Sequence, residues 1–275
     1  MKKNYISWTE QTWNTVSGCT KLGKECINCY ANIITDIRKN NPTYSKYEEG
    51  FDKVVEHKET LNEPYQWKEP TVVFVNSMSD LFHDDVSLDF IKAVFKVMNE
   101  TPQHTYQVLT KRSQNLLKYS NQLNWTDNIW AGVSVGINDT RFRIDDLRQC
   151  GSKHKFISVE PLIEEINDLD LNGIDWVIVG GESGSEDARP LEYDWVIKIK
   201  DICEQQNVPF FFKQWGMPKN NPDLNDPTLD KNHPHHTKGG CMLDGKIYWN
   251  NPSNPDQIVK TIKLFDVDHY VIDEY

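Results

Sequence analysis

The sequence has no apolar run long enough to cross a membrane. Its longest apolar stretches, at residues 176–181 and 208–212, fall far short of the roughly 20 residues that a transmembrane helix needs. The N-terminus carries lysines but no apolar run behind them, so we expect no secretory signal. These absences predict a cytoplasmic protein without a membrane partner.

Glycine, proline and positive charge are also in short supply. With 14 Gly, 13 Pro and 38% apolar residues, the composition excludes fibrous and disordered classes and is typical of one large or two small globular domains. The 30 basic residues face 41 acidic ones, and the net charge of −11 argues against a general polyanion binder. Residues 101–160 differ, with eight basic and five acidic side chains, which leaves room for a phosphate-bearing substrate on one face.

Three of the six cysteines lie close together in the sequence. Cys19, Cys26 and Cys29 are spaced C-x6-C-x2-C in the segment GCTKLGKECINCY. In an intracellular chain such a group favours a metal site over disulfides. A structural zinc needs a fourth ligand to close its tetrahedron, whereas a [4Fe-4S] cluster with three Cys leaves one iron open. Inert cysteines are a further alternative, but the charged residues between them count against it.

The rest of the chain alternates between strand-like and helix-like segments. Runs rich in β-branched and aromatic residues predict strands at 71–76, 104–110, 128–135, 155–159, 175–180 and 208–213. We also expect a short strand before the cysteines. Near-continuous apolar strands that alternate with helices indicate a parallel sheet covered by helices. The pattern therefore predicts an α/β fold, a partial or closed (β/α) barrel, with a doubly wound open sheet as the alternative.

Helix-like spacing of apolar residues recurs between these strands. Residues 86–99 predict an amphipathic helix, and Asp84 and Asp85 are the residues we expect to cap its start. Weaker patterns predict further helices at 113–119, 139–150 and 193–206. The predicted barrel domain covers residues 1–216 with an insertion at 40–70. Residues 217–275 are predicted to form a C-terminal extension that packs on the barrel.

Polar residues follow the predicted strands at the ends where a parallel barrel carries its active site. Ordinary alternatives exist for each group: a Gly-Gly pair is often a tight turn and a Lys-Arg pair is often solvated surface. The cysteine segment follows the predicted first strand, so we expect all of these residues at one mouth. The candidates are Ser77, Ser79, Asp80, Lys111, Arg112, Ser134, Glu160, Gly180, Gly181, Glu182, Lys213 and Gln214.

Taken together, the segments GCTKLGKECINCYA, VFVNSMSDLF, VLTKR, GVSV, SVEPL, VIVGGESG and PFFFKQWG resemble the radical S-adenosylmethionine superfamily. In detail the chain resembles the phage- and plasmid-borne three-cysteine-motif proteins over about residues 5–250. More distantly, the MSD segment and the TK pair at two strand ends are similar to those of spore photoproduct lyase, a radical enzyme acting on DNA. The first cysteine gap is six residues where the superfamily usually has three, so the chain is a variant of the pattern.

The resemblance implies a cofactor and roles for the candidate residues. Cys19, Cys26 and Cys29 are implied to hold a [4Fe-4S] cluster whose open iron binds S-adenosylmethionine. One electron then yields a 5′-deoxyadenosyl radical that abstracts hydrogen from a substrate. An electron donor such as flavodoxin or ferredoxin is implied as a partner. For the methionine part of the cofactor, the resemblance implies that Ser77 or Asp80 contacts the ammonium group and Lys111 the carboxylate. Ser134 is implied to contact the ribose or the carboxylate, and Glu160 and Glu182 the ribose or the substrate, with Ser79, Gly180 and Gly181 also at the cofactor site. The catalytic candidates are Lys111, Glu160 and Glu182.

Two other functions stay open at this point. A zinc-bearing, non-catalytic module that binds nucleic acid or a partner protein would need a fourth ligand, and a metal-free barrel enzyme would use Glu160 and Lys111 as acid and base. Candidates for the fourth zinc ligand are His83, His233, His235, His236 and Cys241. Trp13 and Trp215 are candidates for stacking on a base, although core packing is the ordinary role of tryptophan. The basic excess and the DNA-enzyme resemblance favour a nucleic acid or nucleotide substrate.

Overall fold

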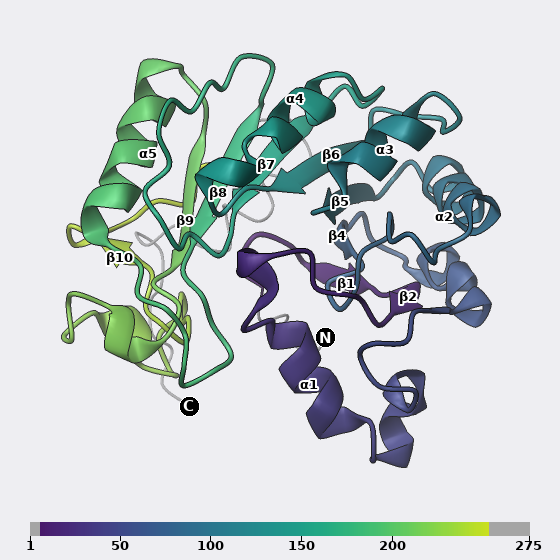
Figure 1. Cartoon of the computed structure of the whole chain (residues 1–275), viewed down its shortest axis with the longest axis horizontal. Coiled ribbons are helices and arrows are strands. Elements are labelled where there is room, and N and C mark those ends of the chain that lie inside the picture. The colour runs from purple at the N-terminus through teal and green to yellow at the C-terminus, as the bar shows by residue number, and fades with distance from the viewer. Residues whose placement is uncertain (1–5, 253–275) are drawn as a thin grey trace.

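The computed structural model describes residues 6–252 and contains a curled sheet of seven parallel strands (Figure 1). The strands follow one another in chain order across the sheet, with β1 and β9 at its two edges. The sheet is therefore an open, partial (β/α) barrel. A doubly wound sheet reverses its strand order at a switch point, and this sheet does not, so that alternative is wrong. The strands are β1 (Gln11–Trp13), β4 (Val72–Val75), β5 (Thr105–Thr110), β6 (Ile129–Ser134), β7 (Lys155–Val159), β8 (Trp176–Gly180) and β9 (Phe210–Gln214).

Both faces of the sheet are buried, which explains the near-continuous apolar strands. Successive side chains alternate between the faces: Val73 and Val75 join the core beneath the helices, whereas Phe74 between them joins an aromatic cluster on the inner face. That inner cluster contains Trp8, Phe74, Trp130, Phe156, Trp176, Ile178 and Phe211. The same alternation sends Ser134 and Ser158 to the inner face, above these aromatic rings.

Four helices lie around the outside of the curled sheet: α2 (Leu88–Glu100), α3 (Ser113–Ser120), α4 (Phe142–Arg148) and α5 (Tyr193–Gln205) (Figure 1). The apolar stripe of α2 is buried against the sheet, as its spacing predicts. Its N-cap is Ser87, whose hydroxyl accepts from the Phe90 amide at 3.2 Å, so the expected capping by Asp84 and Asp85 is wrong. Asp84 instead accepts from the side chain of Asn115.

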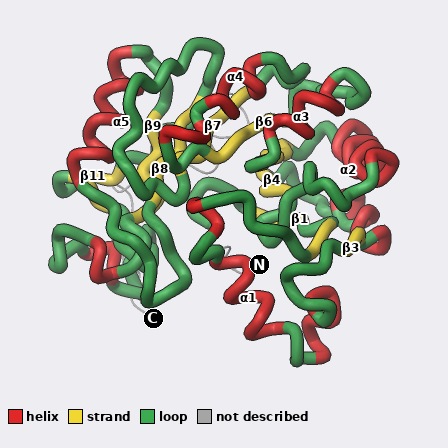
Figure 2. Tube along the Cα trace, viewed as in Figure 1, coloured by secondary structure: helices red, strands yellow, loops and turns green. Residues whose placement is uncertain are grey.

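The segment that carries the three cysteines lies between β2 (Val16–Ser17) and α1 (Tyr30–Arg38). Figure 2 shows that it is mostly loop, with one short helical turn, η1 (Lys24–Cys26). We call residues 19–29 the cysteine loop. The expected strand before it is β1, and α1 then leads away from the sheet (Figure 1).

Short elements occupy the predicted insertion and the predicted extension. Residues 40–70 contain η2 (Pro42–Tyr47), η3 (Lys58–Asn62), η4 (Pro64–Gln66) and β3 (Val55–Glu56), which pairs with β2. After β9 come η6 (Pro218–Asn220), η7 (Pro227–Leu229) and the hairpin of β10 (Met242–Leu243) and β11 (Lys246–Ile247).

The division of the chain at residue 217 stays a prediction, because residues 253–275 of the predicted extension lie outside the described part. Where the structure describes this extension, it contacts the edge strand β9: the Phe212 amide donates to the Tyr248 carbonyl at 2.7 Å. Within residues 6–252, none of the helices has the length and apolar character that crossing a membrane requires.

Candidate functional site

The three clustered cysteines line one cavity of about 180 Å³ at the C-terminal ends of the strands. The residues predicted from the strand ends gather on the same cavity, as the parallel sheet requires. Of these, the following line it: Ser77, Ser79, Asp80, Lys111, Arg112, Ser134, Glu160, Gly181, Glu182, Lys213 and Gln214. Gly180 is not among the lining residues. The structure thus brings the lining residues together, whereas their roles toward a cofactor stay predictions.

Cys19, Cys26 and Cys29 are half-buried free thiols. Burial raises the pKa of the Cys19 thiol to about 11, with the negative charge of Asp80 acting in the same direction and the Arg112 guanidinium opposing it. Cys19 is therefore a neutral thiol near pH 7 in the metal-free chain. Loading a metal there releases a proton, since only the thiolate ligates metals.

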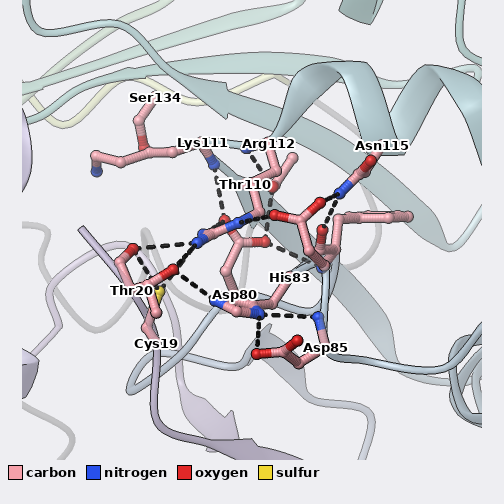
Figure 3. Close-up of polar contacts among 12 residues, drawn as sticks. Cys19, Thr20, Asp80, His83, Asp85, Thr110, Lys111, Arg112, Asn115 and Ser134 are labelled. Carbon is pink, nitrogen blue, oxygen red and sulfur yellow. Dashed lines mark hydrogen bonds and ion pairs between the residues drawn. The ribbon is translucent and has the colours of Figure 1, made fainter. Parts of the chain in front are cut away.

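An arginine after β5 holds the start of the cysteine loop (Figure 3). Arg112 Nη2 donates to the carbonyl of Thr20 at 3.1 Å and to its hydroxyl at 2.9 Å. Its Nη1 lies 3.5 Å from Cys19 Sγ and 3.4 Å from Asp80 Oδ2. The guanidinium thus joins the loop, a cysteine sulfur and the carboxylate that follows β4.

A second arginine, on α4, holds the middle of the cysteine loop through a buried ion pair. Arg143 Nη1 lies 2.7 Å from Glu25 Oε2, and both side chains are at most 6% exposed. Glu25 also accepts from the Gly136 amide at 2.5 Å, and Arg143 donates to the Ser134 carbonyl at 2.7 Å. The one acidic residue between the cysteines therefore points into the fold.

A third arginine, after β8, holds the end of the cysteine loop. Arg189 Nε donates to Glu182 at 2.9 Å, its Nη2 donates to the Lys24 carbonyl at 2.9 Å, and Glu182 accepts from Asn28 at 2.8 Å. Burial would raise the pKa of Glu182, but the hydrogen bonds from Arg189 and Asn28 outweigh it and hold the pKa below its ordinary value. Glu182 thus fastens the loop and has few sites left for a substrate.

Arg143 and Arg189, which hold the middle and the end of the cysteine loop, were not predicted as site residues, and neither was Glu25. A lone acid between the clustered cysteines is the one signal in the sequence that points to such an anchor, because a buried carboxylate requires a cation. Nothing in the local sequence indicates which arginine supplies it.

Both carboxylate oxygens of Asp80 accept hydrogen bonds from within the protein (Figure 3). Its Oδ1 accepts from the Thr110 hydroxyl at 2.7 Å and the Phe82 amide at 3.0 Å, and its Oδ2 accepts from the Lys111 amide at 3.1 Å and from Arg112. These contacts use the four lone-pair directions of a carboxylate. The geometry therefore favours Asp80 as a residue that positions Lys111 and Arg112 over one that meets a cofactor ammonium.

Glu160 forms its ion pair with Lys213 and not with Lys111. Its carboxylate lies 2.8 Å from Lys213 Nζ and accepts from the Ser158 hydroxyl at 3.1 Å. Lys111 Nζ lies 3.5 Å from the main-chain carbonyl of Glu160 and forms no ion pair with any residue between 6 and 252. The metal-free alternative, in which Lys111 and Glu160 act as acid and base, gains no support from this geometry.

Ser77 and Ser79 direct their hydroxyls to the protein. Ser77 Oγ donates to Asn14 Oδ1 at 3.2 Å, and Ser79 Oγ donates to the Val16 carbonyl at 2.7 Å. Both line the cavity, but their hydroxyl protons are engaged in joining the end of β4 to the segment before the cysteine loop.

Packing explains the glycine at the end of β8, Gly180, and the glycine that follows it, Gly181. A Cβ on Gly181 would lie 2.4 Å from the Trp215 carbonyl oxygen, and one on Gly180 would lie 2.5 Å from Glu160 Oε1. Gly181 therefore has no room for a side chain, because its obstacle is main chain, whereas a side chain on Gly180 would require the carboxylate of Glu160 to move.

Several other candidates lie in the core or away from the cavity. Trp13 and Trp215 are at most 1% exposed, so neither is available to stack on a base, whereas Trp8 lines the cavity floor. Cys241 is buried and donates from Sγ to the His235 carbonyl at 3.5 Å. His83 lies 2.8 Å from the Thr20 hydroxyl and accepts from the Asp85 amide.

No three His, Cys, Asp or Glu side chains between residues 6 and 252 are grouped so as to hold a single metal ion. The zinc alternative needs four such ligands around one ion, about 2.0–2.3 Å from it, so the described part of the chain does not support it. A [4Fe-4S] cluster makes a different demand, because each of its cysteines binds a different iron.

The chain matches the model of a family described as protein of unknown function (DUF5131) over residues 3–252. It belongs to the DUF5131 family. No curated protein matches it. Among solved structures, a cysteine-to-serine mutant of spore photoproduct lyase is similar to this DUF5131 protein at 14% identity and a TM-score of 0.40, covering 80% of this chain. The match spans 64% of the length of that structure, and a likeness of this size identifies no activity. The resemblance to the three-cysteine-motif proteins stays a prediction.

Proposed function

We propose that this DUF5131 protein is a radical S-adenosylmethionine enzyme whose Cys19, Cys26 and Cys29 hold a [4Fe-4S] cluster. The observation that carries the proposal is that all three thiols line the cavity formed by the strand ends, on a loop fixed by three arginines. Three thiolates suit three irons of a cubane and leave the fourth iron open for a small molecule. The donor set and its placement therefore fit the cluster.

The rest of the cavity fits S-adenosylmethionine. When bound, the cluster and S-adenosylmethionine supply one-electron cleavage of the sulfonium and removal of a hydrogen atom from a substrate. Among the cations that line the cavity, Arg112 and Lys213 pair with Asp80 and Glu160, whereas Lys111 forms no ion pair with a described residue, so Lys111 suits the carboxylate of the cofactor. Ser134, on the inner face, offers a hydroxyl, and Trp8 and Phe74 give the cavity an apolar floor. Glu160 and Lys213 remain as a polar pair for ribose or substrate.

For the substrate we propose a nucleic acid or nucleotide, and the described side chains that could bind its phosphates are few. The basic excess of residues 101–160 does not form a free cationic face. Arg112 and Arg143 are buried in the loop anchors, Arg148 pairs with Asp145, and Lys153 pairs with an aspartate. What remains inside the cavity is Lys111, beside the Glu160 and Lys213 pair.

The outer face of the cysteine loop suits the proposed electron donor. Two apolar side chains of the loop, Leu22 and Ile27, are 47% and 54% exposed. Lys21 and Lys24 are also exposed, and neither forms an ion pair with a described residue. Glu25 is turned inward, so the outer face of the loop is cationic and apolar within a chain of net charge −11. A small acidic electron carrier of the flavodoxin or ferredoxin type matches that surface.

Anaerobic purification tests the proposal. The protein is expected to be brown, with about four iron and four sulfide per chain, and to form 5′-deoxyadenosine from S-adenosylmethionine once reduced with dithionite. Colourless protein that holds one zinc would contradict the proposal and select the non-catalytic alternative. Full activity after all three cysteines are replaced would select the metal-free alternative.

A further inference from the structure

Arg112 touches a sulfur of the cysteine loop as well as its backbone. We infer that Arg112 sets the reduction potential of the cluster, by holding a permanent positive charge and a hydrogen bond against the ligand sulfur of Cys19. The inference rests on the proposed function. It assigns Arg112 a positioning and tuning role that the anchoring contacts alone do not require.

The contacts orient the guanidinium toward the sulfur. Arg112 is 6% exposed; its Nη1 points between Cys19 Sγ at 3.5 Å and Asp80 Oδ2 at 3.4 Å, while Nη2 is held by Thr20 (Figure 3). The planar fork fixes these directions together, because both nitrogens belong to one rigid group. A lysine at this position keeps the charge but not the two-sided geometry.

Charge decides the direction of the effect. Three thiolates around a cubane core of charge 2+ carry a net charge of −1, and adding one electron makes it −2. A cation in a poorly solvated site stabilises the more negative state, and a hydrogen bond to a ligand sulfur acts in the same direction. Arginine keeps its proton at all accessible pH values, so the contribution is fixed.

The other charges around Arg112 add to the fall in reduction potential that we expect when its guanidinium is removed. Asp80 lies at 3.4 Å and Asp84 at 3.7 Å from the guanidinium, and His83 lies across Thr20. With the guanidinium gone, the Asp80 carboxylate stands uncompensated beside Cys19. Its negative charge also disfavours the reduced cluster, so both effects lower the potential.

The structure contains a matched control for a role confined to anchoring. Arg189 holds the same loop through the Lys24 carbonyl and Glu182, but no contact joins it to a cysteine sulfur among the residues described. If arginine anchoring of the loop were all that mattered, Arg112→Gln and Arg189→Gln would change the potential alike. Tuning through Cys19 predicts a clearly larger shift in Arg112→Gln, because Arg189→Gln leaves only the more remote charge of Glu182 uncompensated.

The test is a redox titration of the full-length, reconstituted protein, followed by electron paramagnetic resonance without S-adenosylmethionine or substrate. Arg112→Gln is expected to lower the ratio of reduced to oxidised cluster at fixed potential at least tenfold, a shift of about 59 mV for one electron. Arg112→Lys is expected to lie between Arg112→Gln and wild type. Arg189→Gln is expected to shift the potential much less than Arg112→Gln, since no contact joins Arg189 to a cysteine sulfur among the described residues.

Iron and sulfide content, measured first, separates the two claims. Wild-type protein without a cluster would remove the proposed function itself. A wild-type cluster whose potential is unchanged in Arg112→Gln, or shifted equally in Arg189→Gln, would overturn only the tuning role. If Arg112→Gln binds no cluster, Arg112→Lys decides: a potential equal to that of wild type would overturn the inference, and a lower one supports it.

Discussion

Gly181 occupies a position where any side chain would meet the backbone that directly follows the neighbouring strand β9. Its amide donates to the Gln214 carbonyl at 2.9 Å, and a Cβ would lie 2.4 Å from the carbonyl oxygen of Trp215. The obstacle is main chain, which cannot rotate away as a side-chain end does. The contact holds the end of β8 against β9 at the cavity wall.

Gly181→Ala is therefore expected to lower the free energy of unfolding by about 1–3 kcal/mol, as overpacking of a tight site does. Gly23→Ala is the control, since a Cβ there meets nothing within 4 Å. Urea unfolding of both variants checks the prediction. Equal stability of the two would show that the strand end yields more easily than its contacts indicate.

At the scale of elements, the cysteine loop is irregular and yet held by residues from three separate post-strand segments. Arg112 follows β5, Arg143 lies on α4 and Arg189 follows β8. A loop with so little helix or strand of its own needs such outside contacts to keep three thiols on one cavity wall. The arginines replace the regular hydrogen bonding that the loop lacks.

The Glu182 anchor makes part of this order sensitive to acid. The hydrogen bonds that hold its folded-state pKa below the ordinary value stabilise the loop at neutral pH, and this contribution is lost as the pH falls through that lowered pKa. Glu182→Gln is expected to cost about 1–3 kcal/mol at neutral pH, because it removes a charged partner from Arg189.

Urea unfolding at neutral pH and well below pH 4.5 measures this loss. The variant and wild type are expected to converge in acid, where Glu182 is protonated in both states. A constant difference across the pH range would mean that the carboxylate charge is not what holds the loop.

The elements themselves were largely predictable, because their apolar pattern is local. All six predicted strands are present, with ends shifted by a few residues, and the helix predicted at 193–206 is α5. The pairing of charges was not predictable. Glu25 and Arg143 are 118 residues apart. Glu160 follows β7 and Lys213 lies on β9, and the two meet only because both strands pair with β8. Such pairs depend on the finished sheet, which short-range patterns do not specify.

At the scale of the whole molecule, the cationic outer face of the cysteine loop contrasts with the acidic chain. Replacing Lys21 and Lys24 with glutamate is expected to slow reduction of the cluster by reduced flavodoxin at least tenfold at low salt, because steering of an acidic carrier is lost. Stopped-flow absorbance of the cluster measures the rate.

Dithionite, a small reductant, is the control and is expected to reduce the variant and the wild type at similar rates. The flavodoxin rate for wild type is also expected to fall with rising salt, as the Debye length shortens, and the rate for the variant is not. A flavodoxin rate that ignores both the substitutions and the salt would place the carrier elsewhere on the molecule.

The iron and acid-labile sulfide content of anaerobically purified protein tests the central claim most directly, compared among wild type, Cys26→Ala and Cys203→Ala. Cys203 is a buried cysteine of α5 that does not line the cavity, so its removal controls for loss of a thiol. The account predicts about four iron and four sulfide per chain in wild type and Cys203→Ala, and almost none in Cys26→Ala. Equal iron in all three proteins, or none in wild type, would contradict it.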